Sequence, residues 1–556
     1  MIESVQLKFG RGPGAGPQVI SGAPITVFVG PNNSGKSKVL SEILTYCQNG
    51  QPNAAHVVLE NVVFKPLDAE KAARELEKVS LPATVGDQFS GDEIFVGKKG
   101  QRHRMSRNQF TSTLRNPKGN TALFCRYYLN YNTLMLDGSS RINLVQQRPF
   151  GDMQSPALNS LQQLFRDDGL RESVRKIIHE AFQMFLVIDP GSGGNLRIRF
   201  SARAPADADE ERGWNSRAVD FHAISQVIDN CSDGVKAFTG MVIEIMAGDP
   251  SVILIDEPEA FLHPALAFKL GKEISAAVAN TEKRIFASTH SPQFLMGCIQ
   301  SGVPINIVRL TYRGGVATAR ILANENLVKL MRNPLLRSAD VMGAIFYESV
   351  VVAEGDTDRA FYQEVNERLL RSAPKRGIPN CLFLNAQNKQ TIRKIIEPLR
   401  RLGIPAAAIV DIDVVKDGGN NWTDFLSSIG VPDELHLSLG QLRASVNKSF
   451  KDSGKCMKKD GGIAVLNSGA AEAAVTLVNL LAEYGGFVVP GGELESWLMS
   501  LGITARKSEW LIEMFERMGE EPNTESYVRP GAGDVWAFMD SVRAWLIAGD
   551  RKGIPA

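Results

Sequence analysis

The sequence has few cysteines and no long apolar run, and these absences exclude several classes of protein. Its six cysteines are scattered along 556 residues without a Cys-x-x-Cys pair, which argues against a zinc site and a disulfide framework. No stretch approaches the roughly 18 uncharged apolar residues of a membrane span. The first residues alternate like a strand and lack the charged-then-apolar form of a signal peptide. We therefore expect a cytoplasmic protein with no membrane partner.

The sequence also lacks an excess of charge of either sign. Lysine and arginine number 62 against 61 acidic residues, so the formal net charge is +1. Any contact with nucleic acid must therefore come from local basic patches. A hydrophobic content of 44% is ordinary for a globular protein, and the length predicts roughly two to four domains.

A glycine-rich stretch that follows an apolar run is the most informative motif of the first half. Gly30-Pro-Asn-Asn-Ser-Gly-Lys-Ser37 fits G-x-x-x-x-G-K-[ST], a loop whose backbone N–H groups hold phosphates. A strand is expected before it and a helix after it, which argues against a simple Gly/Asn turn. The motif predicts that ATP is bound by Gly30, Asn33, Ser34, Gly35, Lys36 and Ser37. Lys36 would reach the β- and γ-phosphates, and Ser37 would help to hold Mg²⁺.

Two later apolar runs also end in polar residues, and one predicted helix begins at a polar residue, Ser232. Residues 251–255 lead into Asp256 and Glu257, and residues 284–289 lead into His290. In an open α/β sheet, ligands lie at the carboxyl ends of strands, so these residues could converge on one nucleotide. Asp256 would position Mg²⁺, Glu257 would polarise the attacking water, and His290 could sense the γ-phosphate. An acidic pair that only caps a strand end is the simpler alternative, but the company of the phosphate loop disfavours it.

The remaining patterns suggest how the chain is divided. Helical periodicity over residues 156–187 predicts a helical insertion at about 154–190, a candidate dimerisation element. Residues 94–96 and 123–125 resemble strands, and residues 207–212 resemble a disordered acidic loop. A new α/β pattern begins near residue 348. We therefore predict one domain over residues 1–340 and a second over residues 341–556.

The second half contains three apolar runs that end in carboxylates. The first leads into Glu354, with Asp358 in the first turn of the next helix; the second ends in Asp411 and Asp413. Period-2 alternation would place Asp411 and Asp413 on one face of a strand. The third run ends in Glu493 and Glu495. So many acids would repel one another unless cations lie among them, and oxygen ligands favour Mg²⁺ or Mn²⁺. Solvated loops after buried strands are the alternative.

Two basic segments are candidates for nucleic-acid contact. The first spans residues 98–104, and the second spans residues 447–459, which we expect to be a flexible loop between the second and third acidic strands. The second segment could hold a DNA backbone with little sequence preference. Either segment could instead be a solvated surface feature.

The first half resembles the ABC-type ATPases. The phosphate loop, Asp256-Glu257-Pro258, His290 and a Ser232-Asp-Gly234 signature occur in that family's order. Residues 254–264 and 288–295 are similar to the recombination, repair and phage-defence branch. The resemblance implies that Ser232 and Gly234 bind the γ-phosphate of a second subunit, so that hydrolysis requires a dimer. The signature keeps only the Ser and one Gly of the common Leu-Ser-Gly-Gly-Gln, which leaves these two residues less well supported.

The second half resembles the TOPRIM fold, through Glu354-Gly-x-x-Asp358 and the later Asp411-x-Asp413. An ABC-type ATPase followed by TOPRIM resembles the overcoming-lysogenization-defect (OLD) family. The implied fold class is α/β, with an N-terminal P-loop ATPase domain carrying a helical insertion and a C-terminal Rossmann-like TOPRIM domain. The resemblance implies metal ligands at Ser37, Asp256, Glu354, Asp358, Asp411, Asp413 and Glu495. Glu493 competes with Glu495, and Lys552 is the candidate for a late lysine near the scissile phosphate, although it could be part of a frayed tail.

The OLD resemblance implies an ATP-regulated, metal-dependent DNA endonuclease that self-associates through its ATPase half. It further implies a role in bacterial defence against phage, with a second defence-system protein as a possible partner. Two alternatives stay open at this point: an ATP-dependent sensor or scaffold that does not cleave, and a TOPRIM-type nuclease that acts on tRNA. A topoisomerase is disfavoured, because the second half has little room for a DNA-gate domain.

Overall fold

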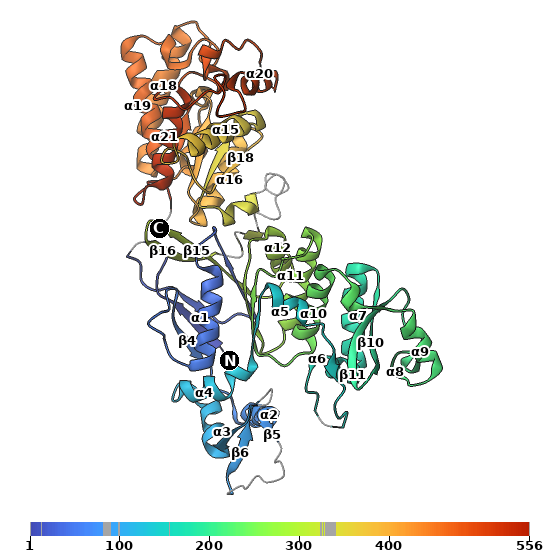
Figure 1. Cartoon of the computed structure of the whole chain (residues 1–556). Coiled ribbons are helices and arrows are strands. Elements are labelled where there is room, and N and C mark those ends of the chain that lie inside the picture. The colour runs from blue at the N-terminus through green and yellow to red at the C-terminus, as the bar shows by residue number, and fades with distance from the viewer. Residues whose placement is uncertain are drawn as a thin grey trace. The chain divides into compact units, whose positions relative to one another are not determined.

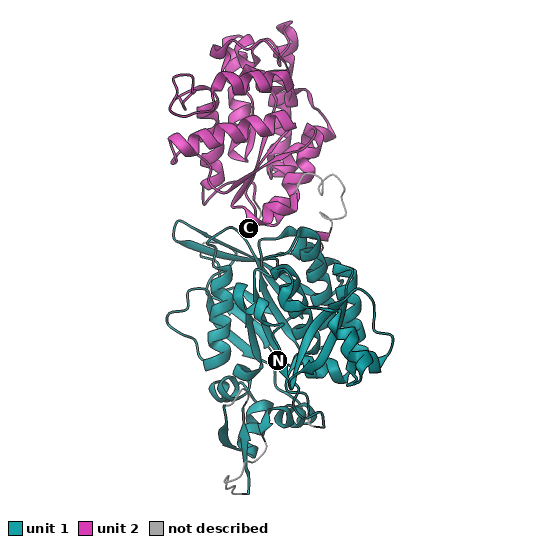
Figure 2. Ribbon diagram, turned by 45° about the vertical axis from the view of Figure 1, so that its right-hand side comes forward, with its two compact units in different colours: residues 1–324 teal, residues 325–556 magenta. Residues whose placement is uncertain are grey.

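The computed structural model describes residues 2–12, 14–81, 91–97, 101–154, 156–322, 325, 327–328, 341–506 and 508–554. The chain forms two compact units, Met1–Asn324 and Glu325–Ala556 (Figure 2). The predicted boundary between residues 340 and 341 borders a stretch, 329–340, that lies outside the described residues, as does the 98–100 part of the first basic segment. Within the described ranges, no helix is long and apolar enough to cross a membrane.

Unit 1 is built around a six-stranded sheet whose order is β16-β15-β3-β14-β13-β8. Neighbouring strands are parallel except for the β15–β16 hairpin. Its strands are β3 (Ile25–Val29), β8 (Thr133–Leu136), β13 (Val252–Asp256), β14 (Arg284–Ser288), β15 (Ile305–Arg313) and β16 (Val316–Leu322). The continuous apolar runs of β3, β13 and β14 are almost wholly buried, as expected for parallel strands covered on both faces. The predicted α/β class is confirmed.

Helices cover this sheet, and smaller sheets extend unit 1 (Figure 1). The helices that connect or cover the central strands are α1 (Lys36–Asn49), α5 (Gly138–Asn143), α10 (Asp233–Ala247), α11 (Pro264–Val278) and α12 (Pro292–Gln300). A second sheet pairs β1 (Ile2–Leu7) with β2 (Val19–Ser21) and β4 (Leu59–Phe64), and a third contains β5 (Ser80–Leu81), β6 (Glu93–Val96) and β7 (His103–Ser106). Helices α2 (Ala69–Val79), α3 (Arg107–Arg115) and α4 (Thr121–Tyr127) lie near these strands in the sequence.

Two local predictions in this unit had different outcomes. The strand at 94–96 is confirmed by β6, whereas residues 123–125 lie in helix α4. The strand prediction was wrong there because Asn120 caps the helix, its side chain accepting the N–H of Leu123. Phe124 and Cys125 then face the core as neighbours on a short helix.

The insertion is mixed α/β. Helices α6 (Ser160–Arg166) and α7 (Asp168–Phe182) occupy part of the predicted helical stretch, but β10 (Phe185–Ser192) already begins within it. Strand β10 pairs with β11 (Asn195–Ser201), which also pairs with β12 (Gln226–Val227) and β9 (Arg148–Pro149).

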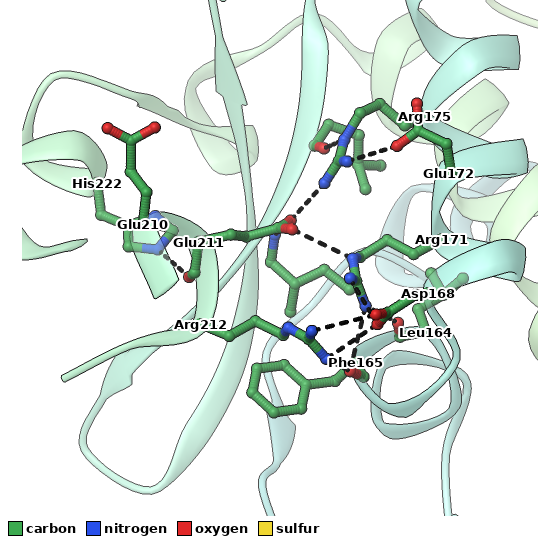
Figure 3. A network of polar contacts seen from close by, with 12 residues as sticks. Leu164, Phe165, Asp168, Arg171, Glu172, Arg175, Glu210, Glu211, Arg212 and His222 are labelled. Carbon is green, nitrogen blue, oxygen red and sulfur yellow. Dashed lines mark hydrogen bonds and ion pairs between the residues drawn. The ribbon is translucent and has the colours of Figure 1, made fainter. Parts of the chain in front are cut away.

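The acidic segment 207–212 is ordered, contrary to the sequence-based prediction. It forms α8 (Ala208–Arg212), capped by Asp207 and followed by α9 (Ser216–Ala223). Glu211 is buried, and its carboxylate pairs with Arg171 at 3.2 Å and Arg175 at 2.6 Å (Figure 3). Two buried arginines thus compensate the carboxylate that composition alone assigned to solvent.

Unit 2 contains a four-stranded parallel sheet of order β18-β17-β19-β20. Its strands are β17 (Ser349–Ala353), β18 (Cys381–Asn385), β19 (Ala406–Val410) and β20 (Gly486–Val488). The helices are α15 (Asp356–Ser372), α16 (Lys389–Arg401), α17 (Asn420–Ser428), α18 (Asp433–Asp452), α19 (Ser468–Glu483), α20 (Ser508–Met518) and α21 (Asp534–Ile547). This alternation of parallel strands and helices confirms the Rossmann-like prediction.

The basic segment 447–459 is not a flexible loop throughout. Helix α18 is 20 residues long and continues to Asp452, with Val446 and Phe450 buried. Lys448 and Lys451 are exposed on its last turns. Apolar side chains at helical spacing keep this part of the segment in the fold.

Candidate functional site

The phosphate loop adopts a conformation that its glycines permit. Gly30 follows β3 with φ 138°, and Gly35 precedes α1 with φ 93°. A Cβ atom on Gly30 would lie 2.1 Å from the carbonyl oxygen of Leu310, so no other residue fits there without movement. Asn33 also has a positive φ, of 61°. The loop therefore turns tightly into the N-terminus of α1, where backbone N–H groups favour anions.

The polar side chains of the loop are suited to phosphate. Lys36 is buried, and its ammonium donates to the carbonyl oxygens of Gly30 at 3.0 Å and Pro31 at 2.7 Å. Burial lowers the pKa of Lys36 to about 8. The buried hydroxyl of Ser34 has no hydrogen-bond partner among the described residues. A buried cation beside an unsatisfied donor fits the phosphates of a nucleotide.

The two strand ends β13 and β14 bring Asp256 to the loop. Ser37 donates its hydroxyl to Asp256 Oδ1 at 2.9 Å, and the Ser288 hydroxyl donates to the same oxygen. These contacts join residues that are 219 positions apart in the sequence. Ser37 and Asp256 therefore offer oxygen ligands side by side, a donor set that suits Mg²⁺.

Glu257 and His290 lie next to this pair. The Glu257 backbone has φ 52°, a strained value for a residue other than glycine, and its N–H donates to the Ser288 carbonyl oxygen at 2.9 Å. The Glu257 side chain is 52% exposed, and its Oε1 lies 4.0 Å from His290 Nε2. Burial lowers the pKa of His290, and the positive charge of Lys36 lowers it further, which favours a neutral imidazole at pH 7.

Two charged residues of this site are additions to the sequence-based set. Glu259 accepts the Thr289 hydroxyl and the His290 N–H, both at 2.8 Å, and burial raises its pKa. Its place two residues after Glu257 could have suggested it. Arg141 of α5 is 1% exposed and donates to the Glu257 carbonyl oxygen. No motif in the sequence marks Arg141.

The signature residues begin helix α10. Ser232 is the N-cap residue, but its side chain makes no capping hydrogen bond. A Cβ atom on Gly234 would lie 2.5 Å from the Phe261 carbonyl oxygen, so α10 closely approaches the loop after Glu257 in the same chain. This close approach accounts for Gly234 without a second subunit, and the role of both residues towards phosphate stays a prediction.

In unit 2, the carboxylates gather where β17, β19 and β20 end. Glu354 follows β17, and its Oε1 accepts the backbone N–H of Asp411 at 3.0 Å. Lys458 Nζ lies 2.5 Å from Asp411 Oδ2, 3.8 Å from Glu493 Oε2 and 4.0 Å from Asp413 Oδ2. One lysine therefore connects acids from two different strand ends.

Burial and mutual repulsion shift the titration of this acidic cluster. Burial, and then the charge of Asp411, raise the pKa of Glu354 to about 8 and that of Asp358 to about 7. Burial also raises the pKa of Asp411, while the hydrogen bond from Lys458 opposes that rise. Glu495 is among the charges that raise the pKa of Asp358 and Asp411. Surplus negative charge of this kind favours hard cations.

The expected geometry of Asp411 and Asp413 was wrong in one respect. Strand β19 ends at Val410, and Asp411 occupies the N-cap position of a 3₁₀ helix over Ile412–Lys416 without a capping hydrogen bond from its side chain, so the two aspartates do not alternate along a strand. The turn still brings both towards Lys458, and Asp413 also lies 3.3 Å from Lys389. Both Glu493 and Glu495 lie near the cluster, so the choice between them stays open.

The acids are close to one another, but they do not form a finished coordination shell. Among the described residues, no group of three or more His, Cys, Asp or Glu side chains is placed to hold a metal ion directly. Lys458 lies among their oxygens instead. The donor chemistry fits Mg²⁺ or Mn²⁺, and holding either would require these side chains to adjust around it.

A segment of each unit matches a known protein family. Residues 198–296, which include Asp256 and His290, match the family described as "AAA domain, putative AbiEii toxin, Type IV TA system". Residues 345–413, from β17 to Asp413, match the "Overcoming lysogenization defect protein-like, TOPRIM domain". The chain thus has an ATPase domain followed by an OLD-like TOPRIM domain. This is the architecture of the OLD family.

Solved structures and curated proteins were compared as well. The Smc head bound to the C-winged helix domain of ScpA is 14% identical, with a TM-score of 0.35 over 59% of this chain and 99% of that chain. The SMC head domain from Thermotoga maritima is 12% identical, with a TM-score of 0.30 over 58% of this chain and 99% of that chain. No curated protein matches the sequence.

Lys552 does not lie with the acids of the TOPRIM domain. Its ammonium pairs with Glu483 at 2.5 Å, at the C-terminus of α19. Glu483 precedes β20, whereas Glu493 and Glu495 follow it, so this ion pair lies at the opposite end of the strand. The structure instead brings Lys458 to Asp411, and Lys389 to Asp413.

Proposed function

We propose that this protein binds and hydrolyses ATP and is a metal-dependent DNA endonuclease of bacterial anti-phage defence. The observation that carries the proposal is the convergence of carboxylates from β17, β19 and β20 around Lys458 in an OLD-like TOPRIM domain. A cluster of hard oxygen ligands beside a cation suits the cleavage of a phosphodiester.

In the ATPase domain, the loop amides and Lys36 hold the triphosphate, and Ser37 with Asp256 would hold Mg²⁺. Glu257, with an exposed side chain on a fixed backbone, accepts the proton of the attacking water. Neutral His290 lies beside Glu257 and can donate a hydrogen bond to the γ-phosphate.

In the TOPRIM domain, Glu354, Asp358, Asp411, Asp413 and Glu495 or Glu493 would hold Mg²⁺ or Mn²⁺. When bound, these ions polarise the phosphate and activate a water nucleophile. Lys458 lies near enough to Asp411 to neutralise charge that develops on the scissile phosphate. Glu354 orients Asp411 by accepting its backbone N–H.

DNA is the proposed substrate, because a lysine-rich face leads to the cluster. Lys448, Lys451 and Lys455 are exposed along and just beyond the end of α18, and Lys458 follows at the acids. Lysines in a row contact phosphates without reading bases. We therefore propose backbone recognition with little sequence preference.

Assembly and location are parts of the same proposal. The Ser232 side chain at the start of α10 makes no capping hydrogen bond, and it would contact the nucleotide of a second copy. A dimer or larger oligomer would therefore be the active form. We place the protein in the cytoplasm, where free cysteine thiols are stable; all six cysteines here are free thiols. A second defence-system protein is a further proposed partner.

The test is plasmid nicking by purified protein with Mg²⁺ or Mn²⁺, with and without ATP. The double variant Asp411→Ala/Asp413→Ala should lose nicking by roughly 1000-fold and still bind ATP. Asp433→Ala, which removes an aspartate that is 94% exposed on α18, is the matched control and should nick normally. Unchanged nicking by the double variant would reject the nuclease assignment. ATP hydrolysis without nicking by the wild type would favour a sensor or scaffold.

A second candidate function is cleavage of RNA. The description of the matching AAA family names a toxin of a type IV toxin–antitoxin system, which supports a toxin-like action. The same acidic cluster could cleave either nucleic acid, since both present a phosphodiester. Replacing plasmid with tRNA in the assay separates the two candidates.

A further inference from the structure

The loop that carries Glu257, the proposed general base, is fixed by a buried arginine from another part of unit 1. Arg141 lies in α5, which follows β8, and only 1% of it is exposed. Its Nη1 donates to the carbonyl oxygen of Glu257. That carbonyl also accepts the Ala260 N–H at 2.9 Å. Both donors fix the peptide group that follows a residue in a strained conformation.

Arg141 is itself held in place. Helix α5 begins with a capping box between Asp137 and Ser140, and Arg141 Nε donates to the Asp137 carbonyl oxygen at 2.9 Å. The guanidinium thus bridges two backbone carbonyls that lie 120 residues apart in the sequence. A planar group with donors in a fixed geometry is well suited to such a bridge, and a lysine cannot reproduce both contacts.

Charge explains why an arginine is tolerated at this buried position. Burial lowers the pKa of Arg141, whereas the negative charges of Glu259, Asp256 and Glu257 oppose that change. The three carboxylates of the nucleotide site therefore stabilise the cation that holds their loop. Its hydrogen bond to Glu257 is made to the backbone carbonyl oxygen, so its action on the carboxylate is indirect.

Helix α5 also connects this loop to the signature helix. A Cβ atom on Gly240 of α10 would lie 2.6 Å from Leu144 Cβ and 3.2 Å from the Arg141 carbonyl oxygen, so α5 and α10 are in close contact. The start of α10 approaches Phe261 in the same loop through Gly234. The loop is thus held at Glu257 by α5 and at Phe261 by α10.

We propose that Arg141 is a positioning residue for ATP hydrolysis, which sets the backbone of Glu257 so that its carboxylate meets the attacking water. The bridge also ties that position to the placement of α5 and α10. This inference rests on the proposed hydrolysis by unit 1, and it adds a residue whose substitution should affect turnover and leave nucleotide binding intact.

The experiment measures ATP turnover and ATP binding in Arg141→Met and Arg141→Lys. We expect kcat to fall roughly 100-fold in the first variant and roughly tenfold in the second, because a small displacement of a catalytic group is costly. KM and the Kd for ATP should stay within threefold of wild type. In the Glu257→Gln background, Arg141→Met should cause little further loss, since both changes affect the same step.

The control is Arg171→Met, which removes another buried arginine from unit 1, one that pairs with Glu211 and Asp168 (Figure 3). A similar fall of kcat in this control would overturn the proposal, because the effect would then be general destabilisation. An unchanged kcat in Arg141→Met, or a loss of ATP binding that matches the loss of turnover, would also overturn it.

Two further measurements keep the outcomes distinct. If the Arg141 variants do not fold, Leu144→Ala, which loosens the contact between α5 and α10, should still lower kcat with KM unchanged; a normal kcat there rejects the inference. Wild-type protein that binds ATP without hydrolysing it rejects the proposed function and the inference together. Normal wild-type hydrolysis with unaffected variants rejects the inference alone.

Discussion

The nucleotide site of unit 1 and the acidic cluster of unit 2 both lie where parallel strands end, but their charges are matched differently. In unit 1, hydroxyl groups donate to Asp256, and Thr289 with His290 donates to Glu259. The ammonium of the buried Lys36 donates to the carbonyl oxygens of Gly30 and Pro31 in the loop. In unit 2, several carboxylates share Lys458, and burial raises the pKa of Glu354 and Asp358.

This difference shows which ligand each site is prepared to accept. In unit 1, hydrogen-bond donors contact Asp256 and Glu259, and a cation lies beside backbone amides, which suits an anion. Unit 2 has more carboxylates than Lys458 and Lys389 can neutralise, which suits a divalent cation. We therefore propose that the same edge of a parallel sheet serves as a phosphate site in one unit and as a metal site in the other.

The largest effect on nucleotide binding is expected when the buried ammonium of Lys36 in unit 1 is removed. Lys36→Ala deletes the buried charge that we propose binds the phosphates, at a cost of about 3 kcal/mol, or roughly 100-fold in ATP affinity. Titration with a fluorescent ATP analogue measures the loss. Mn²⁺ binding by unit 2 should be unchanged.

Lys38→Ala is the matched control for that prediction. Lys38 is two residues away, its side chain is 52% exposed, and it pairs only loosely with Glu42 at 3.8 Å. ATP affinity should stay near the wild-type value, because exposed ion pairs contribute little. Equal losses in the two variants would show that Lys36 is not a phosphate ligand.

The next prediction compares two lysines of unit 2, Lys458 and Lys552. Lys458→Met should lower the nicking rate by about 100-fold, since it removes the cation at the acids, a loss typical of one electrostatic contact to a reacting group. Lys552→Met should leave the rate within twofold, because Lys552 pairs with Glu483 elsewhere. The assay is time-resolved nicking of supercoiled plasmid. Equal rates in Lys458→Met and wild type would remove Lys458 from the site.

Lys458 and Lys552 show how much of a site can be predicted from the sequence. Motifs with fixed spacing, such as Gly30 to Ser37, give both the residues and their geometry, because a short loop between a strand and a helix has few conformations. The parallel sheets followed from buried apolar runs. A late lysine has no such motif, and its position depends on where α18 and the following turns place Lys458, which only tertiary structure decides.

The same argument covers Arg141 and Asp413. Arg141 acts through a contact across 116 residues, and no local pattern encodes such a distance. Asp413 follows a strand that ends one residue before Asp411, where a 3₁₀ turn replaces the expected alternation. Composition likewise suggested a disordered loop at 207–212. That prediction was wrong because the partners that order Glu211 lie about 40 residues earlier, in α7, and composition does not show them. Sequence patterns located the sites, while long-range partners completed them.

The smallest effect, and the sharpest test of the contrast between the units, is the dependence of metal binding on pH. Carboxylates bind a cation in their ionised form, so a bound proton must leave first. With a pKa of about 8 at Glu354 and about 7 at Asp358, protons compete below pH 8 and more strongly below pH 7. Mn²⁺ affinity should therefore fall at least about tenfold from pH 8 to pH 6.

Titration of the nucleotide-free protein with Mn²⁺, followed by electron paramagnetic resonance, measures this dependence. Glu354→Gln removes the group with the higher pKa, so it should bind Mn²⁺ more weakly and flatten the dependence between pH 7 and pH 8. The Asp433→Ala control should reproduce the wild-type curve. A flat profile in the wild type would mean that the carboxylates are already ionised at pH 6, and the proposed surplus of negative charge in the acidic cluster would then be wrong.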